Sequence, residues 1–121
     1  MDNRIRTYRS KSSSKYGNKK CKIDGYTFDS MKEGRRYAEL KILLRSGVIS
    51  NLELQKEFEL QPAFRDSNGK MIRPIYYRAD FVYTDNETGK TVVEDVKGYK
   101  TEGYKLKKKM MAYRGYVIQE I

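Results

Sequence analysis

The sequence predicts an α/β (α+β) fold, in which helices flank a mixed β-sheet. A helix-capping pattern, S-M-K-E, begins at Ser30 and precedes an amphipathic stretch. Apolar and polar residues alternate over 52–60, as in a half-buried strand. A second helix separates two later strands, and strands connected through a helix usually pair in parallel, whereas hairpin strands pair antiparallel. The expected order is helix, strand, strand, strand, helix, strand.

The first helix is expected over 31–45. Ser30 and Glu33 have the S-x-x-E spacing of a capping box, and Gly47 is typical of the C-terminal end of a helix. Apolar residues recur at helical spacing along one side, at Tyr37, Leu40 and Leu44. Glu33 stands one turn earlier on the same side, so its carboxylate is expected to face the rest of the protein. A capping role alone is the alternative, and the two roles are compatible.

Three strands, a second helix and a last strand follow. The segments are, in order, a strand over 52–60, a turn at 66–70, a strand over 75–83, a turn at 85–90 and a strand over 91–97. Thr101 can cap a helix over 102–113. Gly115 separates that helix from a short strand over 116–121. Because this last strand is reached through a helix, it is expected to pair in parallel.

Chain length and composition restrict the possible functions. At 121 residues, one domain over 21–121 is expected, preceded by a flexible basic arm over 1–20. The chain contains no histidine. This excludes a Ser-His-Asp triad, a histidine general base and a zinc site with histidine ligands. Catalysis would therefore depend on carboxylates, lysine, tyrosine or a bound metal ion.

The expected compartment is the cytoplasm. Cys21 is the single cysteine, so no internal disulfide can form, which is typical of a reducing compartment. No apolar stretch approaches the roughly 18 residues that a membrane span needs. The polar, basic start of the chain lacks the apolar centre of a signal peptide. The sequence therefore favours a soluble intracellular protein without membrane contact.

Positive charge is concentrated in two segments. The chain carries 26 Lys and Arg against 16 Asp and Glu, a formal net charge of +10. Residues 1–22 contribute +7 and residues 98–114 contribute +5, so the remainder carries −2. This distribution favours a polyanion that binds at two sides of an acidic site, with solvating surface charge as the alternative. The expected nucleic-acid contacts are Lys19, Lys20, Arg35, Arg36, Lys105 and Lys108.

Two aspartates are expected to face each other on the sheet. If 75–83 and 91–97 form a hairpin with its loop centred at 87–88, Asp80 lies opposite Asp95, with the Cβ atoms roughly 5 Å apart. Like charges at that distance are destabilising unless a divalent cation such as Mg²⁺ compensates them. Lys97 lies two residues beyond Asp95, on the same face, where it can orient an attacking water or stabilise a phosphate.

A different hairpin register would change one acid of this pair. A bulge at Gly89 would place Glu94, rather than Asp95, opposite Asp80. By strand alternation the side chain of Glu94 lies on the other face from that of Lys97. The unbulged register is therefore preferred, with Asp95 as the second acid.

The combination of Asp80 with the tripeptide D-V-K that ends at Lys97 resembles the PD-(D/E)XK nuclease signature, and the order of elements is similar to its restriction-endonuclease-like core. Glu33, within F-D-S-M-K-E, resembles the additional helical acid of such nucleases. Ala79 stands where the signature has proline. More narrowly, K-I-D-G-Y-T-F-D-S-M-K-E-G-R-R-Y and E-D-V-K-G-Y-K-T resemble a family of small phage proteins predicted to be nucleases and related to Holliday junction resolvases.

The resemblance implies an endonuclease that hydrolyses DNA phosphodiesters in phage recombination or replication. Asp80, Asp95 and Glu33 would hold Mg²⁺, which Mn²⁺ can replace, and Lys97 would assist the attacking water. Basic segments around the site suit branched DNA, and a homodimer would place two sites on one junction. The alternatives are a non-catalytic nucleic-acid-binding module, and a nuclease for flap, single-stranded or site-specific duplex DNA.

Overall fold

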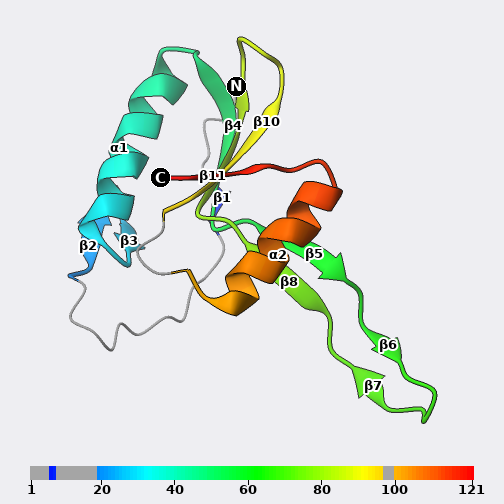
Figure 1. Ribbon diagram of the computed structural model, residues 1–121. Coiled ribbons are helices and arrows are strands. Elements are labelled where there is room, and N and C mark those ends of the chain that lie inside the picture. Colours follow the sequence, from blue (N-terminus) through cyan, green and yellow to red (C-terminus); the bar gives the residue numbers. More distant parts are fainter. Residues whose placement is uncertain (1–5, 8–18, 97–99) are drawn as a thin grey trace.

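The computed structural model describes residues 6–7, 19–96 and 100–121 (Figure 1). A five-stranded sheet has the order β1-β4-β9-β10-β11. Its strands are β1 (Arg6–Thr7), β4 (Ile49–Leu54), β9 (Phe81–Asp85), β10 (Thr91–Asp95) and β11 (Ile118–Glu120). The β4–β9 and β9–β10 pairs are antiparallel, whereas β1–β4 and β10–β11 are parallel. The predicted mixed α+β architecture is confirmed, with the last strand parallel to β10.

Both predicted helices form, with the predicted boundaries. They are α1 (Met31–Arg45) and α2 (Glu102–Tyr113). The side chain of Ser30 accepts a hydrogen bond from the backbone N–H of Glu33 at 3.1 Å. Thr101 caps α2 in the same way, at 3.1 Å from the backbone nitrogen of Tyr104. These caps satisfy backbone N–H groups that have no partner within the helix. Capping residues in the sequence therefore mark where each helix begins.

The helices cover opposite faces of the sheet (Figure 1). On the α1 face, Tyr37 and Leu40 pack with Phe81. On the α2 face, Met111 packs with side chains of three neighbouring strands, Val82, Val93 and Ile118. Successive strand residues alternate between the two cores, as side chains on a pleated strand must. Which face a strand residue takes is therefore set by its position in the strand.

The two long strands expected over 52–60 and 75–83 are each divided in two. β4 is followed by β5 (Glu57–Gln61), and β8 (Ile75–Arg78) precedes β9. β5 pairs with β8, and the ribbon continues through β6 (Phe64–Arg65) and β7 (Met71–Ile72) away from the sheet (Figure 1). The left-handed Gln55, at φ 54°, bends the chain, while Gln55 N–H still donates to the Asp80 carbonyl at 2.9 Å. The alternation of apolar and polar residues continues through the bend, so the sequence pattern predicts one strand where the structure has two.

A hairpin that was not among the expected elements precedes α1. β2 (Cys21–Ile23) and β3 (Tyr26–Phe28) are joined by Asp24 and Gly25, both with positive φ, as in the two-residue turns that suit hairpins. The hairpin packs on α1 where that helix presents Gly34. A Cβ atom at Gly34 would lie 2.6 Å from Cys21 Sγ. The lack of a side chain at this position therefore permits the close contact.

Replacing Gly34 tests this contact. Gly34→Ala is expected to lower the free energy of unfolding by about 1 to 3 kcal/mol, because the added methyl overpacks a buried contact. Gly103→Ala is the matched control, since its new Cβ would have no neighbour nearer than 4.0 Å. Gly103→Ala should be neutral or stabilising by up to about 1 kcal/mol. Urea unfolding of both variants checks this, and equal effects would contradict the packing argument.

Candidate functional site

The two predicted aspartates come together at one end of the β9–β10 hairpin. Observed pairs run from Thr91 opposite Thr84 to Glu94 opposite Phe81, with no bulge. The backbone N–H of Asp80, just before β9, donates to the carbonyl of Glu94 at 3.1 Å, one residue short of the Asp95 that an unbroken ladder would pair with it. The predicted register is confirmed from Thr91 to Glu94, and the bulge at Gly89 is not formed. The ladder does not extend to Asp80 and Asp95, but their side chains form a hydrogen bond.

Both aspartates are held by hydrogen bonds. The hydroxyl of Tyr77 donates to Oδ2 of Asp95 at 2.6 Å, and Asp95 is only 3% exposed. The backbone N–H of Val96 donates to Oδ2 of Asp80 at 2.7 Å. A side-chain hydrogen bond also joins Asp80 to Asp95. These contacts fix both carboxyl groups at the end of the β9–β10 hairpin that lies away from its turn.

Glu33 completes a group of three interacting carboxyls. It lies in the first turn of α1 and is 6% exposed. Burial, and then the charges of Glu33 and Asp95, raise the pKa of Asp80 to about 8. Burial, and then the charges of Asp29 and Asp95, raise the pKa of Glu33 to about 7. The three acids are therefore close enough that each additional charge among them has an electrostatic cost.

Glu33 contributes to the cap with its backbone and to the acid group with its side chain. Its N–H donates to Ser30 Oγ, as in a capping box. A hydrogen bond from the backbone of Asp29 to its carboxylate lowers the pKa of Glu33, but only in part offsets the burial. The two roles expected from the sequence are thus compatible in the structure.

The donor chemistry of this group fits a hard cation. Mg²⁺ commonly binds one or two protein carboxylates and fills its remaining positions with water or phosphate oxygens. Asp80 and Asp95 supply such a pair. Among residues 19–96 and 100–121, no set of three or more Cys, Asp and Glu side chains converges closely enough to hold a metal ion. A cation at Asp80 and Asp95 would therefore need further oxygen ligands from solvent or substrate.

Lys97 lies outside the described residues, so its position in the site stays a prediction. Lys19 and Lys20 are exposed immediately before β2, and Arg35 is exposed on α1. On α2, Lys105 pairs with Glu102 at 3.1 Å and Lys108 pairs with Glu120 at 3.1 Å. These side chains are accessible to a ligand.

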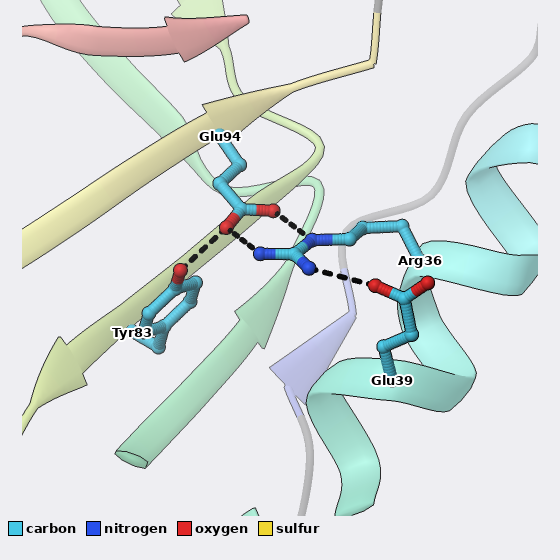
Figure 2. Close-up of polar contacts among 4 residues, drawn as sticks. All are labelled: Arg36, Glu39, Tyr83 and Glu94. Atoms are coloured by element: carbon cyan, nitrogen blue, oxygen red, sulfur yellow. Dashed lines mark hydrogen bonds and ion pairs between the residues drawn. The ribbon is translucent and has the colours of Figure 1, made fainter. Parts of the chain in front are cut away.

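Arg36 differs from the other expected phosphate contacts. Its Nε and Nη2 atoms donate to the carboxylate of Glu94 at 2.7 and 2.5 Å, and Nη1 donates to Glu39 at 2.8 Å (Figure 2). The Tyr83 hydroxyl donates to the same carboxylate of Glu94, which is 1% exposed. This bidentate ion pair connects α1 to β10 and occupies the guanidinium. Arg36 therefore has a structural contact in place of the expected phosphate contact.

Sequence reasoning missed two groups near the acids. Tyr77 is not among the expected site residues, yet its hydroxyl donates to Asp95. Glu120 pairs with Asp95 in the β10–β11 register and contacts Lys100 and Lys108. The alternation of β11, with Ile118 buried, places Glu120 on the α2 face. Parallel pairing was predicted, but its register was not, so this neighbour could not be found.

Comparison with known proteins identifies the family. A family model described as "Protein of unknown function (DUF1064)" matches residues 13–120. The chain belongs to the DUF1064 family. No curated protein and no solved structure matches this DUF1064 chain. In the part of the chain that the structure describes, no helix is long and apolar enough to cross a membrane.

Proposed function

We propose that this DUF1064 protein is a Mg²⁺-dependent endonuclease of the PD-(D/E)XK type that hydrolyses DNA phosphodiesters. The observation that carries the proposal is the hydrogen-bonded pair of Asp80 and Asp95, where burial, and then the charges of Glu33 and Asp95, raise the pKa of Asp80 to about 8. A cation offsets the repulsion among these acids, so the apo protein carries an electrostatic cost that metal binding relieves. The basic residues of α2, adjacent to the acids, support a polyanionic substrate.

The protein side chains have distinct roles in this proposal. Tyr77 holds Asp95, and the Val96 N–H holds Asp80. These two carboxylates would hold the cation. The chemistry that Mg²⁺ or Mn²⁺ supplies when bound is polarisation of the scissile phosphate and activation of a water molecule. Lys97 orients that water and stabilises the negative charge that develops on the phosphate. Glu33 adds negative charge beside the pair and strengthens cation binding.

The proposed substrate is branched DNA, as for a Holliday junction resolvase in phage recombination or replication. Exposed lysines contact the backbone rather than base edges, and backbone contacts recognise the shape of DNA. Paired cuts on one junction need two sites, which a homodimer supplies. We place the activity in the cytoplasm, which is that of the host cell if the protein is phage-encoded.

A cleavage assay on three substrates tests this function. With Mg²⁺, the protein is expected to cut a synthetic four-way junction at least about tenfold faster than a flap or plain duplex of the same sequence. Mn²⁺ should support the reaction and EDTA should abolish it. Faster cleavage of the flap or duplex would contradict the junction preference, but it would still support nuclease activity. DNA binding without product in either metal would favour the non-catalytic binding module.

A further inference from the structure

The acid pair continues into a third carboxylate on the next strand. Val82, Val93 and Ile118 form the α2-side core from three adjacent strands. Two residues farther along β10 and β11, Asp95 and Glu120 lie on that same face. Asp95 pairs with Glu120 in the parallel register, and Ile121 N–H donates to the Asp95 carbonyl at 2.9 Å. Adjacent strands lie about 4.8 Å apart, so Glu120 is one strand away from the proposed metal-binding pair.

Glu120 has a different electrostatic environment from the other two acids. Its Oε1 accepts from Lys100 Nζ at 3.0 Å and from Lys108 Nζ at 3.1 Å. Its Oε2 accepts from the Tyr104 hydroxyl at 2.8 Å. The hydrogen bonds from Tyr104, Lys100 and Lys108, in that order, lower the pKa of Glu120 to about 2. Glu120 is therefore an anion at neutral pH and holds two ammonium groups at the end of the sheet.

These groups line a cleft of about 470 Å³. Its lining residues are Lys100, Tyr104, Lys105, Lys108, Lys109, Ala112 and Glu120. Four ammonium groups and one carboxylate give the lining a formal charge of +3. Tyr104 also connects the cleft to the acid pair, because its ring lies 6.4 Å from the ring of Tyr77, whose hydroxyl binds Asp95. A site that attracts anions thus adjoins a site that attracts cations.

We propose that this lysine cleft binds backbone phosphate of the DNA strand, adjacent to the scissile phosphate that would reach Asp80 and Asp95 only through their cation. The inference rests on the proposed function and assigns a binding site that the acid pair alone cannot provide, because carboxylates repel phosphate. Lysine ammonium groups bind phosphate oxygens as point charges, without reading the bases. Glu120 holds Lys100 and Lys108 in position and reduces the positive charge of the cleft, so it competes with the phosphate for them.

Two charge-matched pairs of variants test the lysine cleft. Lys108→Gln removes a charge from the cleft, whereas Lys90→Gln removes one at the turn at the opposite end of the β9–β10 hairpin, where Lys90 is exposed. Binding of a fluorescent four-way junction is measured in EDTA, so that no cleavage is needed. Lys108→Gln should weaken binding about fivefold at low salt and reduce the salt slope by about 1, with Lys90→Gln near wild type. Equal effects of the two variants would overturn the proposal.

The second pair tests Glu120. Glu120→Gln removes the competing anion and should tighten junction binding about threefold, while Glu87→Gln, an exposed residue in the 85–90 turn, should change it less. Weaker or unchanged binding by Glu120→Gln would contradict the competing role of this residue. The glutamine can still accept from Tyr104, so the fold is expected to be retained.

A third arm distinguishes a DNA strand from a small phosphate ligand. Deoxyadenosine monophosphate is titrated into wild type and Lys108→Gln. The DNA assignment would be overturned in favour of a mononucleotide site if deoxyadenosine monophosphate binds with submillimolar affinity only when Lys108 is present, while junction binding does not depend on Lys108. Lys108-dependent junction binding without Mg²⁺ cleavage would contradict the proposed nuclease and leave the lysine cleft as a nucleic-acid site. If Lys108→Gln changes neither cleavage nor junction binding, the lysine cleft is overturned and the proposed nuclease stands.

Discussion

Asp95→Asn is expected to lower the rate of junction cleavage in Mg²⁺ by about 100-fold or more, because it removes a negative charge from the proposed metal-binding pair. The amide oxygen of asparagine can still accept the hydrogen bond from the Tyr77 hydroxyl, so the buried side chain keeps its partner. The variant also removes a like charge from the neighbourhood of Asp80 and Glu33. Stability should therefore not fall. Single-turnover cleavage and circular dichroism measure the two properties separately.

Glu87→Gln is the control for this variant. Both changes replace a carboxylate by its amide, but Glu87 is exposed in the turn at the other end of the hairpin. Its cleavage rate should remain within about twofold of wild type. A folded Asp95→Asn protein that cuts the junction at the unmutated rate would refute the assigned role of Asp95. A loss of activity in both variants would indicate a general effect of net charge.

Asp80→Asn is expected to change how stability depends on pH in the absence of metal. Its pKa is about 8 in the folded protein, well above the ordinary 3.8. The folded state therefore holds this proton more tightly than the unfolded state does. The resulting stability is present below about pH 4 and is lost as the pH rises through about 8. Wild type should thus become less stable across this interval, by an amount on the order of 2 to 5 kcal/mol.

Asparagine does not titrate, so the Asp80→Asn variant should lose most of the decrease in stability with rising pH. Thermal unfolding in EDTA at pH 5 and pH 8 measures it. The variant should gain stability relative to wild type at pH 8 and gain little at pH 5. A smaller slope should remain, because Glu33 has its own pKa raised to about 7. If the stability of wild type and of Asp80→Asn changes with pH in parallel, Asp80 is not the acid whose raised pKa causes the pH dependence.

Local signals in the sequence were sufficient for the helices and for the hairpin register. The caps at Ser30 and Thr101 locate the helix starts, because both satisfy exposed backbone N–H groups. The 85–90 turn sets the β9–β10 register, which brings Asp80 and Asp95 close enough for a side-chain hydrogen bond. These features depend on residues within a few positions of one another, which is the range over which sequence patterns are most informative.

Longer-range features could not be obtained in the same way. The bend at Gln55 leaves the apolar alternation intact, so one long strand and two short strands have the same pattern. The ion pair of Arg36 with Glu94 joins residues that are 58 positions apart. The position of Glu120 beside Asp95 depends on a parallel register that is set only when α2 packs on the sheet. Each of these features is decided by tertiary packing.

Mn²⁺ binding to the intact protein tests the central claim most directly. Isothermal titration at pH 8, without DNA, compares wild type with Asp95→Asn and Glu87→Gln. A cation held by Asp80 and Asp95 should bind wild type and Glu87→Gln with similar affinity, and Asp95→Asn at least about tenfold more weakly. Equal binding to wild type and a folded Asp95→Asn variant would contradict the assignment of this acid pair as the metal site.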